Sequence, residues 1–168
     1  MFELVTMRRK KRACSDPKQV LAAFSEACEL TLALKDEPYP YAVTVNYAPM
    51  VQEDELYLLF HGAKAGRKYD LICHDPRCAF TITLRSQVEL SARPQYSTNF
   101  FKSLSGEGTI KLLEGQAAFD ACVQLMMHHG YHGDLTQLKE QIQSSLPVTQ
   151  MFALHVERAG LKEHSPAP

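Results

Sequence analysis

LYLLFHGAKAGRKYDLI, residues 56–72, joins an apolar run to three closely spaced cations. The run over residues 56–61 is short, apolar and aromatic, which predicts a buried β-strand. A helix is expected over about residues 64–73, and it should end at Asp75-Pro76 because a proline disfavours helix continuation. The cations Lys64, Arg67 and Lys68 therefore follow directly on a buried strand.

The spacing of these cations suggests an anion site. If a helix begins near Ala63, all three share the face near its N-terminus, where like charges repel and have the wrong sign for the helix dipole. A bound dianion would make this arrangement favourable. The small residues Gly62, Ala63 and Gly66 would let backbone amides approach a phosphate. A solvated helix face is the alternative interpretation.

His61 ends the apolar strand beside these cations. A histidine at this place either is a structural side chain at the end of a barrel or lies where a cofactor ring or substrate meets the protein. In the second case His61 would orient a substrate or donate a proton, and it is the one candidate for a catalytic residue.

Other segments of the chain predict a mainly β protein with flanking helices. Ser15 or Asp16 can cap a short first helix, and Pro17 suits its first turn. Strands are expected at 30–35, 41–48, 56–61, 77–84, 99–115 and 149–160, and helices at 116–130 and 134–146. Residues 99–115 read as one long strand or a strand pair with a bend at the glycines, whereas the polar residues 86–98 give no clear pattern.

The order of these elements favours an antiparallel sheet that closes into a small barrel, because short turns rather than crossover helices join most strands. A chain of 168 residues is most simply one domain. We expect a single domain over residues 1–168, with a basic N-terminal segment at 1–14 and a helical pair at 115–148.

Composition limits the partners. The formal net charge of −1 gives no attraction of the whole chain to nucleic acid or an anionic membrane. The five cations at 8–12 fit a solvated N-terminal segment better than a nucleic-acid arm, because no basic surface with interleaved aromatic residues follows. No apolar stretch is long enough to span a membrane. The five cysteines are odd in number and scattered, which predicts free buried thiols and a cytoplasmic protein.

Two groups of residues resemble metal sites. His128, His129 and His132 are close in sequence, but Gly130 should break the helix that would align them. Cys73 and Cys78 flank a turn with unusual spacing for zinc, and buried thiols explain them better. We expect no metal.

The sequence resembles a known family in four places. YPYAVTVNYAP at 39–49 and LYLLFHGAKAGRKYDLICHDPRCAFTI at 56–82 are similar to flavin-binding split-barrel proteins related to pyridoxamine 5′-phosphate oxidase. Within that family the chain most resembles the nitroimidazole-resistance branch, which MRRKKR at 7–12 and FKSLSGEGTIKLLEG at 101–115 also resemble. The sequence differs from this branch at Thr44, where proline is common, and at Gly62, where serine is common.

The resemblance implies a six-stranded antiparallel split β-barrel that forms a homodimer, with one FMN at each of two sites along the subunit interface. It places the flavin ring on one group of residues and the ribityl phosphate on a second, while a third group would reach across the interface. The ring residues are Val43, Thr44, Val45 and Asn46; the phosphate residues are His61, Gly62, Ala63, Lys64, Arg67 and Lys68; the interface residues are Phe101, Lys102 and Ser103.

The function implied by this resemblance is an FMN-dependent oxidoreductase that reduces a small molecule, with a nitroimidazole as one candidate substrate. The alternative is a non-catalytic flavin- or haem-binding protein, in which His61, His155 or the histidines at 128–132 would be candidate axial ligands. Oxidation of pyridoxamine phosphate itself fits less well, since the arginine and histidine pattern for the substrate phosphate is not evident near the C-terminus.

Overall fold

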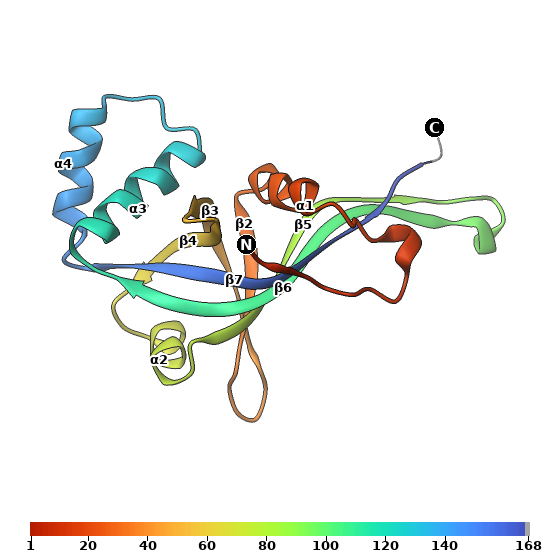
Figure 1. Ribbon diagram of the computed structural model, residues 1–168, viewed down its shortest axis with the longest axis horizontal. Helices are drawn as coiled ribbons and strands as arrows, with labels where there is room; N and C mark the ends of the chain where they lie inside the picture. Colours follow the sequence, from red (N-terminus) through yellow and green to blue (C-terminus); the bar gives the residue numbers. More distant parts are fainter. Residues whose placement is uncertain (167–168) are drawn as a thin grey trace.

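A computed structural model describes residues 1–166, in which a strongly curved sheet is flanked by helices (Figure 1). The strands are β1 (Glu3–Leu4), β2 (Glu29–Leu34), β3 (Tyr41–Gln52), β4 (Glu55–Ala63), β5 (Arg77–Glu89), β6 (Thr98–Leu113) and β7 (Thr149–His164). The α-helices are α1 (Pro17–Ala23), α2 (Arg67–His74), α3 (Gly115–His128) and α4 (Leu135–Ser145). Short 3-10 turns are η1 (Lys10–Arg12), η2 (Phe24–Glu26) and η3 (Pro94–Tyr96).

Six of the strands form a closed ring. The order is β7-β4-β3-β2-β5-β6, and β6 pairs back with β7. Every pairing in the ring is antiparallel, while the two-residue β1 adds to β7 in parallel. The prediction of a mainly β fold, with a six-stranded antiparallel split barrel and flanking helices, is confirmed.

The inner face of the ring is apolar because alternate residues of each strand point inward. Phe60 of β4 stacks on Phe152 of β7 with ring centroids 4.9 Å apart, and both side chains are fully buried. Helix α1 and η2 close one end of this core with Val20 and Phe24. The Tyr47 hydroxyl donates a hydrogen bond of 2.6 Å to the main-chain oxygen of Phe24, which ties η2 to β3.

Replacing Tyr47 with phenylalanine should lower the free energy of unfolding by about 1–3 kcal/mol, because the Phe24 carbonyl would be left buried without its donor. Urea denaturation of both proteins measures the difference. Tyr39→Phe is the matched control, since the Tyr39 side chain is 77% exposed. Equal stability of Tyr47→Phe and the parent chain would show that the hydrogen bond contributes nothing.

A second apolar cluster lies on the outer face of the sheet, under α3. Ala118, Ala121 and Leu125 of the helix pack on Leu59 of β4 and Met151 of β7. Helices α3 and α4 therefore cover only one part of the outer face, as Figure 1 shows at the left of the molecule.

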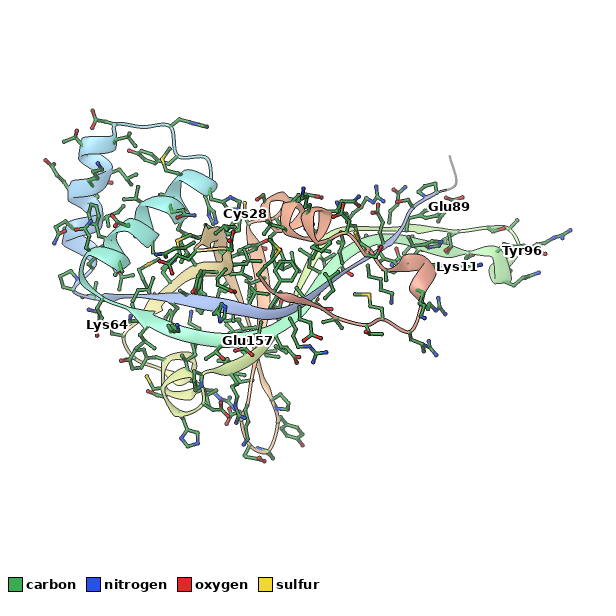
Figure 2. The ribbon with its side chains drawn as sticks, viewed as in Figure 1. Lys11, Cys28, Lys64, Glu89, Tyr96 and Glu157 are labelled. Carbon is green, nitrogen blue, oxygen red and sulfur yellow. The ribbon has the colours of Figure 1, made fainter. Side chains whose placement is uncertain are left out.

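The long β5–β6 hairpin continues beyond the ring as an arm, made of residues 85–102. Strand β5 runs to Glu89, so the polar segment that gave no clear pattern is largely strand and turn. Glu89 and Tyr96 lie at the far end of the molecule from Lys64 (Figure 2). Strand β6 is one strand from Thr98 to Leu113 with a bulge between Glu107 and Gly108, which decides between the two expectations for this segment.

The prediction of buried thiols is only partly right. All five cysteines are free, but Cys28 and Cys73 are exposed and only Cys78 is buried. Cys73 follows Ile72 on α2, and the helix turns it away from the core that Ile72 enters. In the part of the chain from 1 to 166, no helix is long and apolar enough to cross a membrane.

Candidate functional site

The predicted phosphate residues lie where β4 leads into α2. The helix begins at Arg67, three residues later than the cation spacing required, because Gly66 stands before it with a φ of 100°. Residues 64–66 form a bend instead of a first helical turn. The prediction that Lys64, Arg67 and Lys68 share one helix face is therefore wrong for Lys64, which lies on the connecting loop.

Lys68 turns back over the end of β4. Its ammonium donates to the main-chain oxygen of His61 at 3.2 Å and lies 5.8 Å from the centroid of the Phe60 ring. A Cβ atom at position 62 would lie 2.8 Å from the Lys68 ammonium, so Gly62 leaves the space that this side chain occupies. Burial lowers the pKa of Lys68. A nearby anion would stabilise the charged form of Lys68 and offset part of this lowering of its pKa.

Arg67 already has a partner in the chain. Its Nε donates to Oδ2 of Asp36 at 2.7 Å, and its guanidinium lies 5.0 Å from the centroid of the Tyr41 ring. The hydrogen bond from Arg67 is the main reason that the pKa of Asp36 is lowered. Arg67 thus holds the β2–β3 turn against α2. Of these three cations, Lys64 and Lys68 form no ion pair within the described residues, so their charges are not compensated.

Next to these cations, a face of the sheet is left uncovered by helices. Thr44 and Asn46 of β3 point outward and are exposed, whereas Val45 is in the core and Val43 packs against it. Only the backbone of these two valines is available to a ligand on this face. The face continues across β2 and β5, in register with Thr44, through Thr31 and Thr81, and through Ala33, Ala42 and Ala79.

Small side chains make this face flat enough for a planar ring, and the exposed Glu29 of β2, opposite Asn46, is the charged residue at its edge. The Thr31 and Thr44 hydroxyls lie 3.2 Å apart, and one donates to the other. The sequence analysis did not predict that residues of β2 and β5 belong to this face. The alternation in residues 77–84 does indicate that Ala79 and Thr81 share a face. Their position beside Thr44 depends on strand pairing, which the sequence does not display.

His61 lies on the same outer side, opposite Met151 of β7. Its side chain remains partly accessible, but burial lowers its pKa, and the charges of Lys68 and His129 lower it further. His61 is therefore neutral at pH 7 and can accept or donate one hydrogen bond at each ring nitrogen.

The lowered pKa of His61 predicts a loss of stability in acid. The unfolded chain takes up a proton on this histidine near its ordinary pKa of about 6.5, whereas the folded chain does so only at lower pH. Its contribution to stability is complete above that ordinary pKa and decreases as the pH falls below it. Urea midpoints measured from pH 7.5 to 5 should therefore fall less for His61→Asn than for the parent chain, and parallel curves would contradict this.

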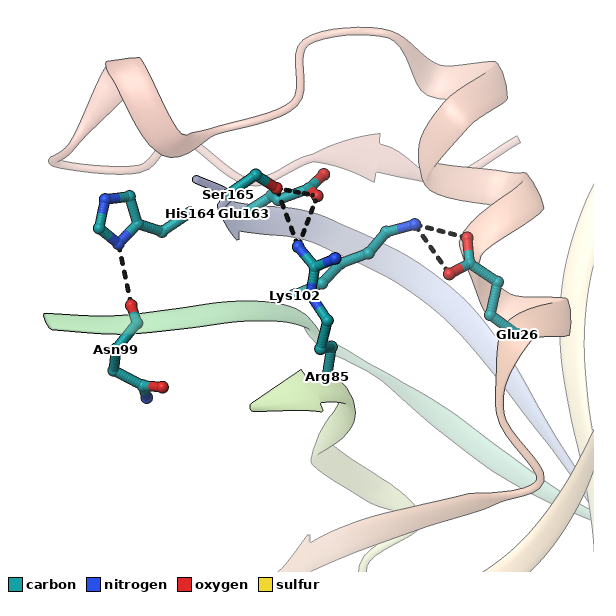
Figure 3. A network of polar contacts seen from close by, with 7 residues as sticks. All are labelled: Glu26, Arg85, Asn99, Lys102, Glu163, His164 and Ser165. Carbon is teal, nitrogen blue, oxygen red and sulfur yellow. Dashed lines mark hydrogen bonds and ion pairs between the residues drawn. The ribbon is translucent and has the colours of Figure 1, made fainter. Parts of the chain in front are cut away.

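Phe101, Lys102 and Ser103 lie elsewhere in the single chain. Lys102 donates to both carboxylate oxygens of Glu26, at 2.5 and 2.8 Å (Figure 3). The Arg12 guanidinium and the Lys162 ammonium lie 5.8 and 5.4 Å from the centroid of the Phe101 ring. These residues are toward the other end of β6 from Leu113, so the fold of one chain does not bring them to the phosphate residues.

A cavity of about 610 Å³ opens on the other side of Lys64. It lies between α2, the start of α3 and the end of α4. The lining residues are Lys64, Tyr69, Leu113, Glu114, Gly115, Gln116, Ala118, Phe119, Gln143, Leu146, Pro147, Thr149 and Gln150. Apart from Lys64, the sequence predicted none of these as site residues.

The profile of the pyridoxamine 5′-phosphate oxidase family matches residues 16–163. The chain belongs to this family. No curated protein matches the sequence.

Three solved structures illustrate the fold of this pyridoxamine 5′-phosphate oxidase family member. A conserved hypothetical protein of Mycobacterium tuberculosis has a TM-score of 0.70 at 16% identity, covering 97% of this chain and 98% of its own. A candidate 5-nitroimidazole antibiotic resistance protein of Bacteroides thetaiotaomicron has a TM-score of 0.67 at 16% identity, with 89% and 85% covered. An FAD- and haem-binding protein of Mycobacterium smegmatis has a TM-score of 0.68 at 14% identity, with 94% and 75% covered.

The histidines of α3 have structural contacts in this family member. Nε2 of His128 lies 3.1 Å from the Ala27 oxygen, and Nε2 of His129 lies 3.1 Å from the Tyr47 oxygen. Helix α3 ends at His128, as the position of Gly130 predicted, so His132 is not aligned with it. Among residues 1–166, no three His, Cys, Asp or Glu side chains are grouped to hold a metal ion.

Proposed function

We propose that this protein is an FMN-dependent reductase of a small molecule. The observation that carries the proposal is the junction of two surfaces: the uncovered sheet face of small side chains around Thr44 meets the unpaired cations Lys64 and Lys68 at the β4–α2 connection. A planar ring with a phosphate at the end of its side chain matches both surfaces. Membership of the pyridoxamine 5′-phosphate oxidase family supports flavin as that ligand.

The residues present fit the phosphate of FMN. Gly62 leaves room for Lys68, the Lys68 ammonium needs a counter-charge in its partly buried place, and Lys64 is free on the loop. His61 and Ala63 border the same place on β4. Arg67 would serve mainly to fix the turn at Asp36 and only secondarily contact the phosphate. Because position 62 is glycine and not serine, no hydroxyl at this position can donate to the phosphate. Backbone amides would donate to the phosphate instead.

The ring end would rest on Thr44, Asn46 and the backbone of Val43 and Val45. Bound FMN would accept two electrons from a donor and pass them to an organic substrate on its open face. In this scheme neutral His61 orients the substrate or gives up a proton to it. The fold shared with a candidate nitroimidazole-resistance protein makes a nitroimidazole the first substrate to test.

A homodimer would complete the site. Residues Phe101, Lys102 and Ser103 are too far along β6 to reach the phosphate residues of their own chain, so they would have to come from a second subunit. The uncovered sheet face and the exposed Val88 and Leu90 of the arm support such an interface. In this proposal residues 1–168 are one domain, with FMN at the interface of two chains. Sedimentation as a monomer with bound flavin would contradict it.

A visible spectrum after addition of FMN and desalting tests the proposed function directly. Flavin bands should remain with the protein, and anaerobic NADH or NADPH should bleach them. Addition of a nitroimidazole should then restore the oxidised spectrum. Flavin that is retained but never reduced would indicate a non-catalytic flavin-binding protein. A Soret band would favour haem, and a colourless protein would contradict the proposal.

A further inference from the structure

The cavity beside Lys64 contains an unusual buried side chain. Gln150 is only 5% exposed, and its Nε2 donates to the main-chain oxygens of Leu113 at 3.0 Å and Met151 at 2.9 Å. Two carbonyl acceptors require the amide nitrogen on that side, so the orientation of the amide is fixed. Its Oε1 must therefore point the other way.

The Gln150 Oε1 accepts no hydrogen bond from the described residues. No fully buried side-chain polar atom in residues 1–166 lacks a partner, so this oxygen is accessible. Gln150 lines the cavity, which is the space that we assign to this oxygen. A ligand with an N–H or O–H group directed at Gln150 would satisfy it. The neighbouring Thr149, Gln116 and Gln143 supply further uncharged polar groups.

The same cavity also suits an anion near Lys64. Helix α3 begins at the cavity with Gly115 at a φ of 55°, no side chain caps its first turn, and that turn holds no acidic residue. Its free amides and the Lys64 ammonium both favour negative charge. Glu114 is the one acid in the lining, and it confines an anion to the Lys64 side while offering acceptors to hydroxyl groups.

We infer that this cavity binds an adenine nucleotide moiety. The exocyclic amino group of adenine would donate to Gln150 Oε1, the base would pack on the apolar Leu113, Phe119 and Leu146, and the phosphate would lie at Lys64 and the start of α3. Ribose hydroxyls would donate to Glu114. The moiety could belong to the flavin, as FAD, or to a pyridine dinucleotide electron donor, and in either case its biological role rests on the proposed function.

Calorimetric titration of the protein with AMP and two AMP analogues, without added flavin, tests the site. The groups of the ligand are changed and the protein is not. AMP should bind. Purine riboside 5′-monophosphate, which lacks the amino group, and adenosine, which lacks the phosphate, should each bind at least about tenfold more weakly. Equal affinity for AMP and the purine riboside nucleotide would overturn the inference, as would no binding of AMP.

A charge variant checks the place of binding. Lys64→Gln should weaken AMP binding by about tenfold. Lys18→Gln is the matched control, because it removes an exposed cation on α1, away from the cavity, and it should leave the affinity unchanged. The same loss in both variants would show non-specific attraction of the nucleotide and overturn the inference.

Titration of FMN-loaded protein separates this inference from the proposed function. Both proposed phosphate positions use Lys64, so AMP should bind beside FMN with reduced affinity but the same preference over the purine riboside nucleotide. Complete displacement of AMP by FMN would place both ligands in one phosphate site and overturn the inference. Displacement by FAD but not FMN would assign the moiety to the flavin, and displacement by NADPH would assign it to the donor. If AMP binds with the stated selectivity while FMN is not retained, the inference stands and the proposed function fails.

Discussion

The double substitution Lys64→Glu and Lys68→Glu should weaken FMN binding at least about 100-fold, because each lost hydrogen bond to a charged group costs about 1.5–3 kcal/mol and a tenfold change in affinity is about 1.4 kcal/mol. Charge reversal adds repulsion of the phosphate. Fluorescence quenching of FMN during titration with the protein measures the dissociation constant. The effect should be on affinity, since neither residue lies at the ring end of the proposed site.

Two controls make this result interpretable. Lys18→Glu makes the same change of charge as each of the two substitutions, but Lys18 lies on α1. The FMN affinity of this control should stay within about twofold of the parent value, a change of well under 1 kcal/mol. Because Lys68 is partly buried, the double glutamine variant should be measured as well, with circular dichroism to show that each protein is folded. Unchanged affinity in a folded double variant would rule out the phosphate assignment.

Truncating Phe152 to alanine should produce the largest loss of stability, about 3–5 kcal/mol. The ring is fully buried, stacks on Phe60 at 4.9 Å and meets the edge of Tyr69 from α2 at 6.4 Å. Alanine would leave a cavity between the ring of strands and α2, which the closed sheet cannot easily collapse to fill. Urea or thermal unfolding gives the difference.

This substitution also tests whether the core supports the site. A Cβ atom at position 62 would lie 3.5 Å from the Phe152 ring and 2.8 Å from the Lys68 ammonium, so Phe152 borders the place where Lys68 lies. We therefore expect weaker FMN binding in the folded fraction of Phe152→Ala. Val51→Ala, near the end of β3 and 55% exposed in the parent chain, is the control for both measurements. A loss of less than about 1 kcal/mol would mean that the core repacks around the site.

The sequence predicted the fold well because the core strands carry strong local patterns. Residues 56–61 lie within β4 and residues 149–160 lie within β7. Asp16, one of the two expected caps, accepts a hydrogen bond from the Lys18 amide at the start of α1. The start of α2 was predicted three residues early. Charge spacing suggested that start, but the backbone conformation of Gly66 decided it, and a glycine in a sequence fits either a helix or a turn.

The candidate site was only partly accessible from the sequence. The cations at 64–68 are visible as a cluster, yet the pairing of Arg67 with Asp36 joins residues 31 positions apart. Likewise the two faces of β3 could be separated by alternation, but not which face the ring of strands would enclose. The cavity at Gln150 depends on three segments that meet only after folding, and no local signal in the sequence marks it.

The order of the strands around the ring has a consequence for synthesis of the chain. Strand β7, the last along the sequence, pairs with both β4 and β6. Until residues 149–164 have left the ribosome, the nascent chain therefore has two open sheet edges whose hydrogen-bonding groups are unpaired. Folding of the ring cannot finish during translation of the earlier segments, and this intermediate is the form in which chaperones or neighbouring nascent chains would meet the protein.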